Sequence, residues 1–135
     1  FSLSRGLGDV YKRQQKRKKI VAVEPENCPT LNVALKKGKP SNVSVSGVAA
    51  SALGAKSIGN ICFNLSKENQ IESLVISDDE IETARRLLWE NHRIFVEPAG
   101  AAALAAIISG KYKPKTDEKL AVLICGANPN IIPEF

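Results

Sequence analysis

The sequence predicts a single domain with an α/β layer architecture. Three observations support this prediction. Short β-rich runs alternate with segments of helical spacing, residues 99–109 are almost wholly apolar, and residues 120–125 form a continuous apolar run. A wholly apolar helix has to be buried against its neighbours, and an uninterrupted apolar run is typical of a central strand covered on both faces.

The composition narrows the classes of protein that fit. The 135 residues are 44% hydrophobic and 24% charged, which allows one compact domain and excludes a collagen-like, coiled-coil or fully disordered chain. No apolar run reaches the roughly 18 residues that a membrane-spanning helix needs, and we expect no signal peptide in the first residues. The three cysteines have no C-x-x-C spacing, which argues against a disulfide scaffold or a zinc site and fits a reducing cytosol.

The net charge of +5 is concentrated at one end of the chain. Residues 1–19 hold seven Lys or Arg residues and one acid, whereas the other 116 residues have a net charge of −1. Basic runs can bind phosphates, but Tyr11 is the only aromatic residue within this one, so stacking on single strands has little support. We therefore expect no nucleic-acid partner.

The first half of the chain contains three predicted strands and two predicted helices. Residues 20–23 are β-rich, and Pro25 should stop that strand. Pro29 suits the first turn of a helix that ends at Gly38 and Pro40, with its apolar face formed by Leu31, Ala34 and Leu35. The following small and polar residues predict a loop and a short helix over 48–55. Residues 61–65 and 73–76 are then predicted as strands separated by a polar turn.

The clearest helix start is at Ser77. Its hydroxyl can cap the free amides, Glu80 can reach back to the amide of Ser77, and the acidic first turn favours the positive end of the helix dipole. The apolar face repeats at helical spacing, with Arg85 and Arg86 facing outward; its members are Ile81, Ala84, Leu87 and Leu88.

The second half ends in two apolar segments. Residues 94–96 should be extended up to Glu97, and the helix over 99–109 should be closed by Gly110. The predicted strand over 120–125 leads directly into Gly126.

Ligands of open α/β sheets bind beyond the carboxyl ends of the strands. The predicted strand ends carry Glu24, Glu97 and the segment from Cys125 to Asn128. From the residues alone, Cys125 fits a ligand contact or an inert buried thiol, and Glu97 and Glu24 fit a site or a cap and a turn. His92 fits a solvated helix end better than a base, and Trp89 fits the core.

Five stretches together resemble the C-terminal third of threonine/serine dehydratases (ammonia-lyases). These are pyridoxal-phosphate enzymes of the tryptophan-synthase-β-like fold type, which includes serine racemase. The stretches occur in the family's order over about 110 residues: IVAVEPENCPTL, VSGVAASALGAKSIG, VISDDEIETARRLLWE, IFVEPAGAAALAAIISGKY and VLICGANPN. The resemblance implies a three-layer fold with a mostly parallel sheet.

The resemblance also implies a cofactor site for pyridoxal 5'-phosphate. Cys125 matches the family's Ser or Cys that hydrogen-bonds the pyridine nitrogen, and Gly126 and Asn128 belong to the same loop. Gly47 matches the small residue whose backbone lies against one face of the ring. Glu97 matches a carboxylate behind the ring that would position the loop of Cys125.

A cation site is implied as well. Glu24 and the carbonyl of Cys28 match oxygen ligands that suit potassium, magnesium or calcium. Thr30 stands where some members have Asp, which changes the charge of that site. Ser46 likewise replaces the commoner Asp before Gly47.

The family's Schiff-base lysine and phosphate-binding glycine loop match nothing in this chain, so no catalytic residue is assigned and we expect the chain to be inactive alone. Residues 1–14 resemble translated sequencing adapter, so we expect a disordered artefact there and a partial enzyme domain over 15–135. The complete enzyme would be a cytoplasmic homo-oligomer, not membrane-bound, acting on L-threonine or L-serine in isoleucine biosynthesis or catabolism. The alternatives are a serine racemase and a non-catalytic small-ligand-binding or dimerisation module.

Overall fold

The computed structural model describes residues 19–127. The predictions for residues 1–14 and for Asn128 lie outside this range. The elements in chain order are β1 (Val21–Pro25), α2 (Thr30–Lys37), α3 (Ala50–Leu53), α4 (Asn60–Glu68), β2 (Glu72–Ile76), α5 (Asp78–His92) and α6 (Pro98–Ile108).

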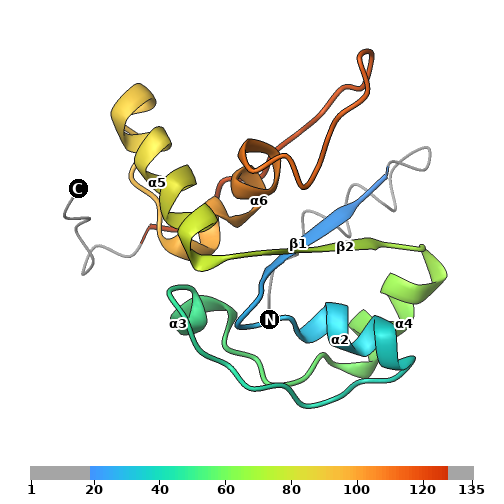
Figure 1. Ribbon diagram of the computed structural model, residues 1–135. Helices are drawn as coiled ribbons and strands as arrows, with labels where there is room; N and C mark the ends of the chain where they lie inside the picture. The colour runs from blue at the N-terminus through green and yellow to red at the C-terminus, as the bar shows by residue number, and fades with distance from the viewer. Residues whose placement is uncertain (1–18, 128–135) are drawn as a thin grey trace.

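The two strands form a parallel sheet at the centre of the molecule, with Val21 opposite Glu72 and Pro25 opposite Ile76. Helices α5 and α6 lie on one side of this sheet, and α2, α3 and α4 lie on the other (Figure 1). Helix-covered parallel strands are the layered α/β arrangement that the sequence predicted, so the fold class is confirmed.

The core lies where α6 meets the sheet and α5. Ile76 and Ile81 are fully buried there, between β2 and α5. The buried face of α6 consists almost entirely of alanines and one glycine, and these small residues allow the helix to approach its neighbours closely. The prediction of a buried apolar helix is therefore confirmed, with bounds one residue earlier than expected.

The capping box at Ser77 is also confirmed. The Ser77 hydroxyl accepts a hydrogen bond from the Glu80 amide at 3.2 Å, and the Glu80 carboxylate accepts one from the Ser77 amide at 2.7 Å. The prediction that Arg85 faces outward is wrong. Its side chain is buried against residues 94–96 and donates from Nε to the Val96 carbonyl at 3.0 Å, whereas Arg86 is exposed.

The predicted strand over residues 61–65 is wrong, because this segment belongs to α4. Phe63 and Ser66 are its buried residues, three positions apart as on a helix face, while Ile61 is 76% exposed. A short run with two apolar neighbours does not distinguish a strand from a helix by its pattern.

Two other boundaries differ from the predictions. Strand β1 includes Pro25, because a proline at the last position of a strand interrupts no further pairing. Residues 120–125 form no strand, and Leu120 and Leu123 are 43% and 45% exposed. A strand exists only in a hydrogen-bonded ladder, and within residues 19–127 no strand pairs with this segment.

Helix α3 is shorter than the helix predicted over residues 48–55. Within the described range, no helix combines the length and the apolarity that a bilayer crossing requires.

Candidate functional site

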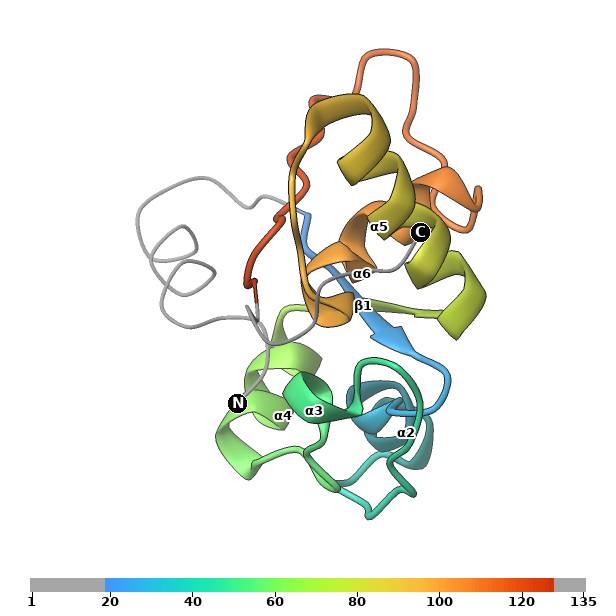
Figure 2. The ribbon, with the colours of Figure 1, turned by 90° about the vertical axis from the view of Figure 1, so that its left-hand side faces the viewer.

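The loops with predicted roles lie at one edge of the sheet. Figure 2 shows the carboxyl end of β1 together with the start of α6, the short helix α3 and the last described residues on the same side of the molecule. The carboxyl ends of parallel strands are where α/β folds bind ligands.

Residues 125–126 rest on the start of α6. The Glu97 amide donates to the Gly126 carbonyl at 3.1 Å, and Glu97 is the N-cap residue of α6. Gly126 has a φ of +82°, which favours glycine, and a Cβ at this position would overlap the Glu97 carboxylate. Glu97, Cys125 and Gly126 are thus brought together, with Cys125 exposed to solvent.

Gly100 is a residue of this arrangement that the sequence analysis missed. It lies in the first turn of α6, and a Cβ there would overlap the Cys125 carbonyl oxygen and approach its carbon to 2.8 Å. A glycine inside an otherwise apolar helix is the signal that could have identified it, because such a glycine often permits close approach of another backbone.

Gly47 lies on a separate exposed loop before α3 and has a φ of +85°. We expected its lack of a side chain to keep a ligand face open. The space that a Cβ would enter is instead occupied by the Asp78 carboxylate, whose Oδ1 would lie 2.9 Å away. The opposite side of Gly47 is therefore free, and the constraint on residue type comes from behind the loop.

Cys28 is buried beneath the same loop. Its thiol donates to the Ser46 carbonyl with a sulfur-to-oxygen distance of 3.2 Å. Burial raises the pKa of Cys28, and the nearby acids Asp78 and Glu24 add to this rise. The thiol consequently stays protonated and serves as a hydrogen-bond donor.

Glu24 and Thr30 are held by the protein itself. The two carboxylate oxygens of Glu24 accept from the amides of Leu31 and Asn32 at 2.7 and 2.8 Å, at the start of α2. The Thr30 hydroxyl donates to the Ala55 carbonyl at 2.8 Å, and the Cys28 carbonyl accepts from the Thr30 amide at 3.0 Å.

These contacts do not fit the expected cation site. Each of the three expected oxygen donors is already engaged in a protein hydrogen bond, and residues 19–127 contain no group of three His, Cys, Asp or Glu side chains arranged to hold a metal. Burial raises the pKa of Glu24 above its usual 4.5, an effect that the amides of Leu31 and Asn32 partly oppose. We derive no step through a cation.

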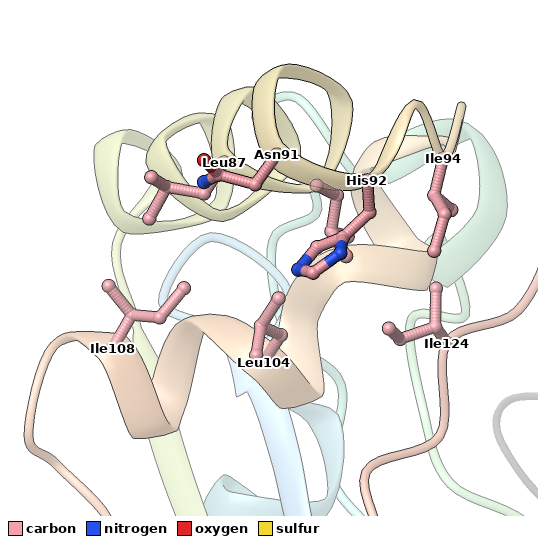
Figure 3. Close-up of a pocket in the computed structure, with 8 residues that line it drawn as sticks. Leu87, Asn91, His92, Ile94, Leu104, Ile108 and Ile124 are labelled. Carbon is pink, nitrogen blue, oxygen red and sulfur yellow. The ribbon is translucent and has the colours of Figure 1, made fainter.

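An apolar groove of about 400 Å³ lies between α5 and α6. Figure 3 shows Leu104 and Ile108 of α6 opposite Leu87 and Asn91 of α5, with His92 and Ile124 at one end. His92 is exposed, and neither Glu97 nor Gly47 lines this groove. The groove is therefore separate from the loops described above.

The chain matches the family model described as "Pyridoxal-phosphate dependent enzyme" over residues 2–126. It is 30% identical over 131 residues to "L-threonine dehydratase biosynthetic IlvA" of Haemophilus influenzae, covering 95% of this chain and 25% of that protein. It is 36% identical over 75 residues to "Serine racemase" of Dictyostelium discoideum, covering 55% and 23% of the two chains. The chain thus spans about a quarter of the length of these relatives.

Solved structures agree with these matches. A bacterial threonine deaminase, from T.th., superposes with a TM-score of 0.80 at 28% identity, covering 95% of this chain and 45% of that one. The serine racemase of Dictyostelium discoideum superposes with a TM-score of 0.60 at 29% identity, covering 69% and 29%.

Proposed function

Because the chain belongs to the pyridoxal-phosphate dependent enzyme family, we propose that it is the C-terminal part of an L-threonine/L-serine ammonia-lyase. The complete enzyme converts the amino acid into a 2-oxo acid and ammonia. The observation that carries the proposal is the 30% identity to a threonine dehydratase over 131 residues, almost the whole of this chain.

The residues around Cys125 fit the cofactor. The exposed thiol stands at the end of an apolar segment, and the loop is packed on α6 so closely that Gly100 and Gly126 tolerate no side chain. Such a fixed loop presents a weak donor and bare backbone to a flat ring. The cofactor supplies an electron sink for the α-carbon of the amino acid when it is bound.

The chain's own residues then have distinct tasks. Cys125 accepts or donates a hydrogen bond at the ring nitrogen, and because a thiol is a weak acid it leaves that nitrogen largely unprotonated. Glu97 and Gly126 hold the loop of Cys125 in place through the amide-to-carbonyl bond at 3.1 Å. The free side of Gly47 lies against a face of the ring. A moderate electron sink favours loss of the side-chain hydroxyl over reprotonation of the α-carbon.

The remaining parts of the proposal concern the complete protein. The lysine that binds the cofactor and the loop that binds its phosphate belong to the portion outside this chain. The enzyme is a cytoplasmic homo-oligomer that acts on a small amino acid without membrane or nucleic acid, in isoleucine biosynthesis or amino-acid catabolism. A potassium, magnesium or calcium ion that activates the enzyme stays a prediction.

The test is an assay of the full-length protein with L-threonine and L-serine. We expect release of 2-oxo acid, and none from the 135-residue chain alone. Cys125→Ser should retain activity, whereas Cys125→Asp should lower kcat with both substrates by stabilising a protonated ring nitrogen. Cys62→Ser, at an exposed cysteine of α4, is the matched control. An unchanged kcat in Cys125→Asp would remove the role given to this thiol.

Serine racemisation is the second candidate, favoured by the 36% identity to a serine racemase over 75 residues. Chiral analysis of serine in the same reaction distinguishes the two activities. A protein that binds no pyridoxal phosphate would instead support a non-catalytic binding or dimerisation module.

A further inference from the structure

Asp78 is the residue through which α5 holds the loop of Gly47. Its Oδ2 accepts from the Val48 amide at 3.3 Å and from the side-chain amide of Asn27 at 3.1 Å. The same carboxylate fills the space behind the Cα of Gly47. One side chain therefore contacts the end of β1, the loop and the start of α5.

The other end of the loop is fixed independently. The Ser46 amide donates to the Asn27 carbonyl at 3.1 Å, and the Cys28 thiol donates to the Ser46 carbonyl. Gly47 thus lies between two anchored residues, Ser46 on the side of β1 and Val48 on the side of Asp78. Its positive φ is set by these contacts.

Helix capping alone does not explain the position of this carboxylate. Its Oδ1 is buried and has no hydrogen-bond partner among residues 19–127, which costs free energy. A side chain that served only the helix dipole would gain by turning to solvent, as the neighbouring exposed Asp79 does. The contacts with the loop account for the inward orientation of Asp78.

We propose that Asp78 is a positioning residue that sets the place of Gly47, and through it the face on which the cofactor ring lies. This inference rests on the proposed function for the cofactor. The anchoring of the loop itself does not depend on a cofactor. The sequence analysis had assigned Asp78 only to the helix dipole.

The test uses the full-length protein with its cofactor removed and then restored. The variants are Asp78→Ala, Asp78→Asn and, as the matched control in the same helical turn, Asp79→Ala. Hydrogen exchange of the peptide spanning residues 43–50 is measured without cofactor. Titration with pyridoxal phosphate, followed by its visible absorbance, then gives the dissociation constant of each variant.

In Asp78→Ala we expect exchange in this peptide and the dissociation constant to rise roughly tenfold over Asp79→Ala, as for loss of one charge-assisted hydrogen bond. Asp78→Asn keeps an acceptor oxygen for the Val48 amide, so it should show smaller rises and partial rescue. It also serves as the test variant if the alanine protein does not fold.

Equal exchange and equal affinity in the Asp78 and Asp79 variants would overturn the inference. Faster exchange with unchanged affinity would overturn the link to the cofactor. If the wild-type protein binds no pyridoxal phosphate, the proposed function fails, and with it the cofactor half of the inference; the exchange measurement still decides the anchoring half.

Discussion

At the scale of single residues, two glycines determine how closely residues 125–126 approach α6. Gly126 contacts the carboxylate of Glu97, and Gly100 contacts the carbonyl of Cys125. The two contacts come from opposite partners, so neither side of this interface has room for a methyl group. The thiol of Cys125 is held by backbone packing around it.

Gly100→Ala should therefore disturb the site more than its small size suggests. Its Cβ would overlap the Cys125 carbonyl oxygen and lie 2.8 Å from its carbon, which are backbone atoms that cannot rotate away. We expect a loss of about 1–3 kcal/mol in the free energy of unfolding of the full-length protein, the usual effect of overpacking, together with weaker cofactor binding.

The control is Gly59→Ala, since a Cβ at Gly59 has nothing within 4 Å. Denaturant unfolding of both variants gives the comparison. Equal stability of the two would show that the Cys125 loop moves freely away from α6.

Glu24 gives a prediction about pH. Burial raises the pKa of Glu24 above 4.5 in the folded protein. Between the unfolded and the folded pKa the folded state binds more protons, so the contribution of Glu24 to stability is full below pH 4.5 and is lost as the pH rises through the folded pKa. Glu24→Gln removes this titration.

The measurement is the free energy of unfolding of wild type and Glu24→Gln over a pH series. The difference, wild type minus variant, should fall as the pH rises from about 4.5 and level off above the folded pKa. A difference that grows with pH would mean that the amides of Leu31 and Asn32 outweigh burial and lower the pKa.

At the scale of elements, α5 is joined to the segment before α6 by Arg85. Its Nε donates to the Val96 carbonyl at 3.0 Å, and its Nη1 lies 2.8 Å from a carboxylate oxygen of Glu82. Glu82 is partly exposed, so the ion pair itself contributes little. The bond to the buried carbonyl is the stronger reason for the inward position of Arg85.

Arg85→Ala should lower the free energy of unfolding by about 1–3 kcal/mol, because the Val96 carbonyl loses its donor in a buried place. Arg86→Ala, at the exposed neighbouring position, should change it by less than about 0.5 kcal/mol. Thermal or denaturant unfolding of the full-length protein measures both. Equal effects would mean that water replaces the guanidinium at Val96.

The contrast between α5 and α4 explains which elements the sequence can predict. Helix α5 carries its own start signal at Ser77 and a long apolar repeat, so local chemistry specifies it. Helix α4 begins at Gly59 without a side-chain cap, and its apolar residues fit either period. Arg85 was misplaced for a related reason, since its partner Val96 lies on another element and leaves no local pattern.

At the scale of the whole molecule, the site residues could be named from the sequence only through a family pattern. Their contacts join segments far apart in the chain: Asp78 meets Gly47, Glu97 meets Gly126, and Gly100 meets Cys125. No local periodicity encodes such pairs. The layered order of strands and helices, by contrast, follows from alternation along the chain and was predicted correctly.

The apolar run over residues 120–125 is the largest difference between pattern and structure, and its cause lies beyond these residues. Part of it lines a cavity of about 460 Å³ beside β1 and α6, and Leu123 is 45% exposed. Exposed apolar runs lose the free energy that burial would provide. The threonine deaminase structure matches 95% of this chain with only 45% of its own, so we expect neighbouring strands to come from the rest of the protein.

The prediction is that residues 120–125 form a strand in the full-length protein. Their amides should then exchange with solvent slowly, because a ladder pairs them, whereas the same amides should exchange quickly in the 135-residue chain. Strand β2 is the internal control, since its pairing with β1 is present in this chain and should protect its amides in both samples. Rapid exchange of residues 120–125 in the full-length protein would contradict the strand. Slow exchange in the isolated chain would instead mean that the segment finds a partner there, in β1 or in a second copy, through the open edge of the sheet.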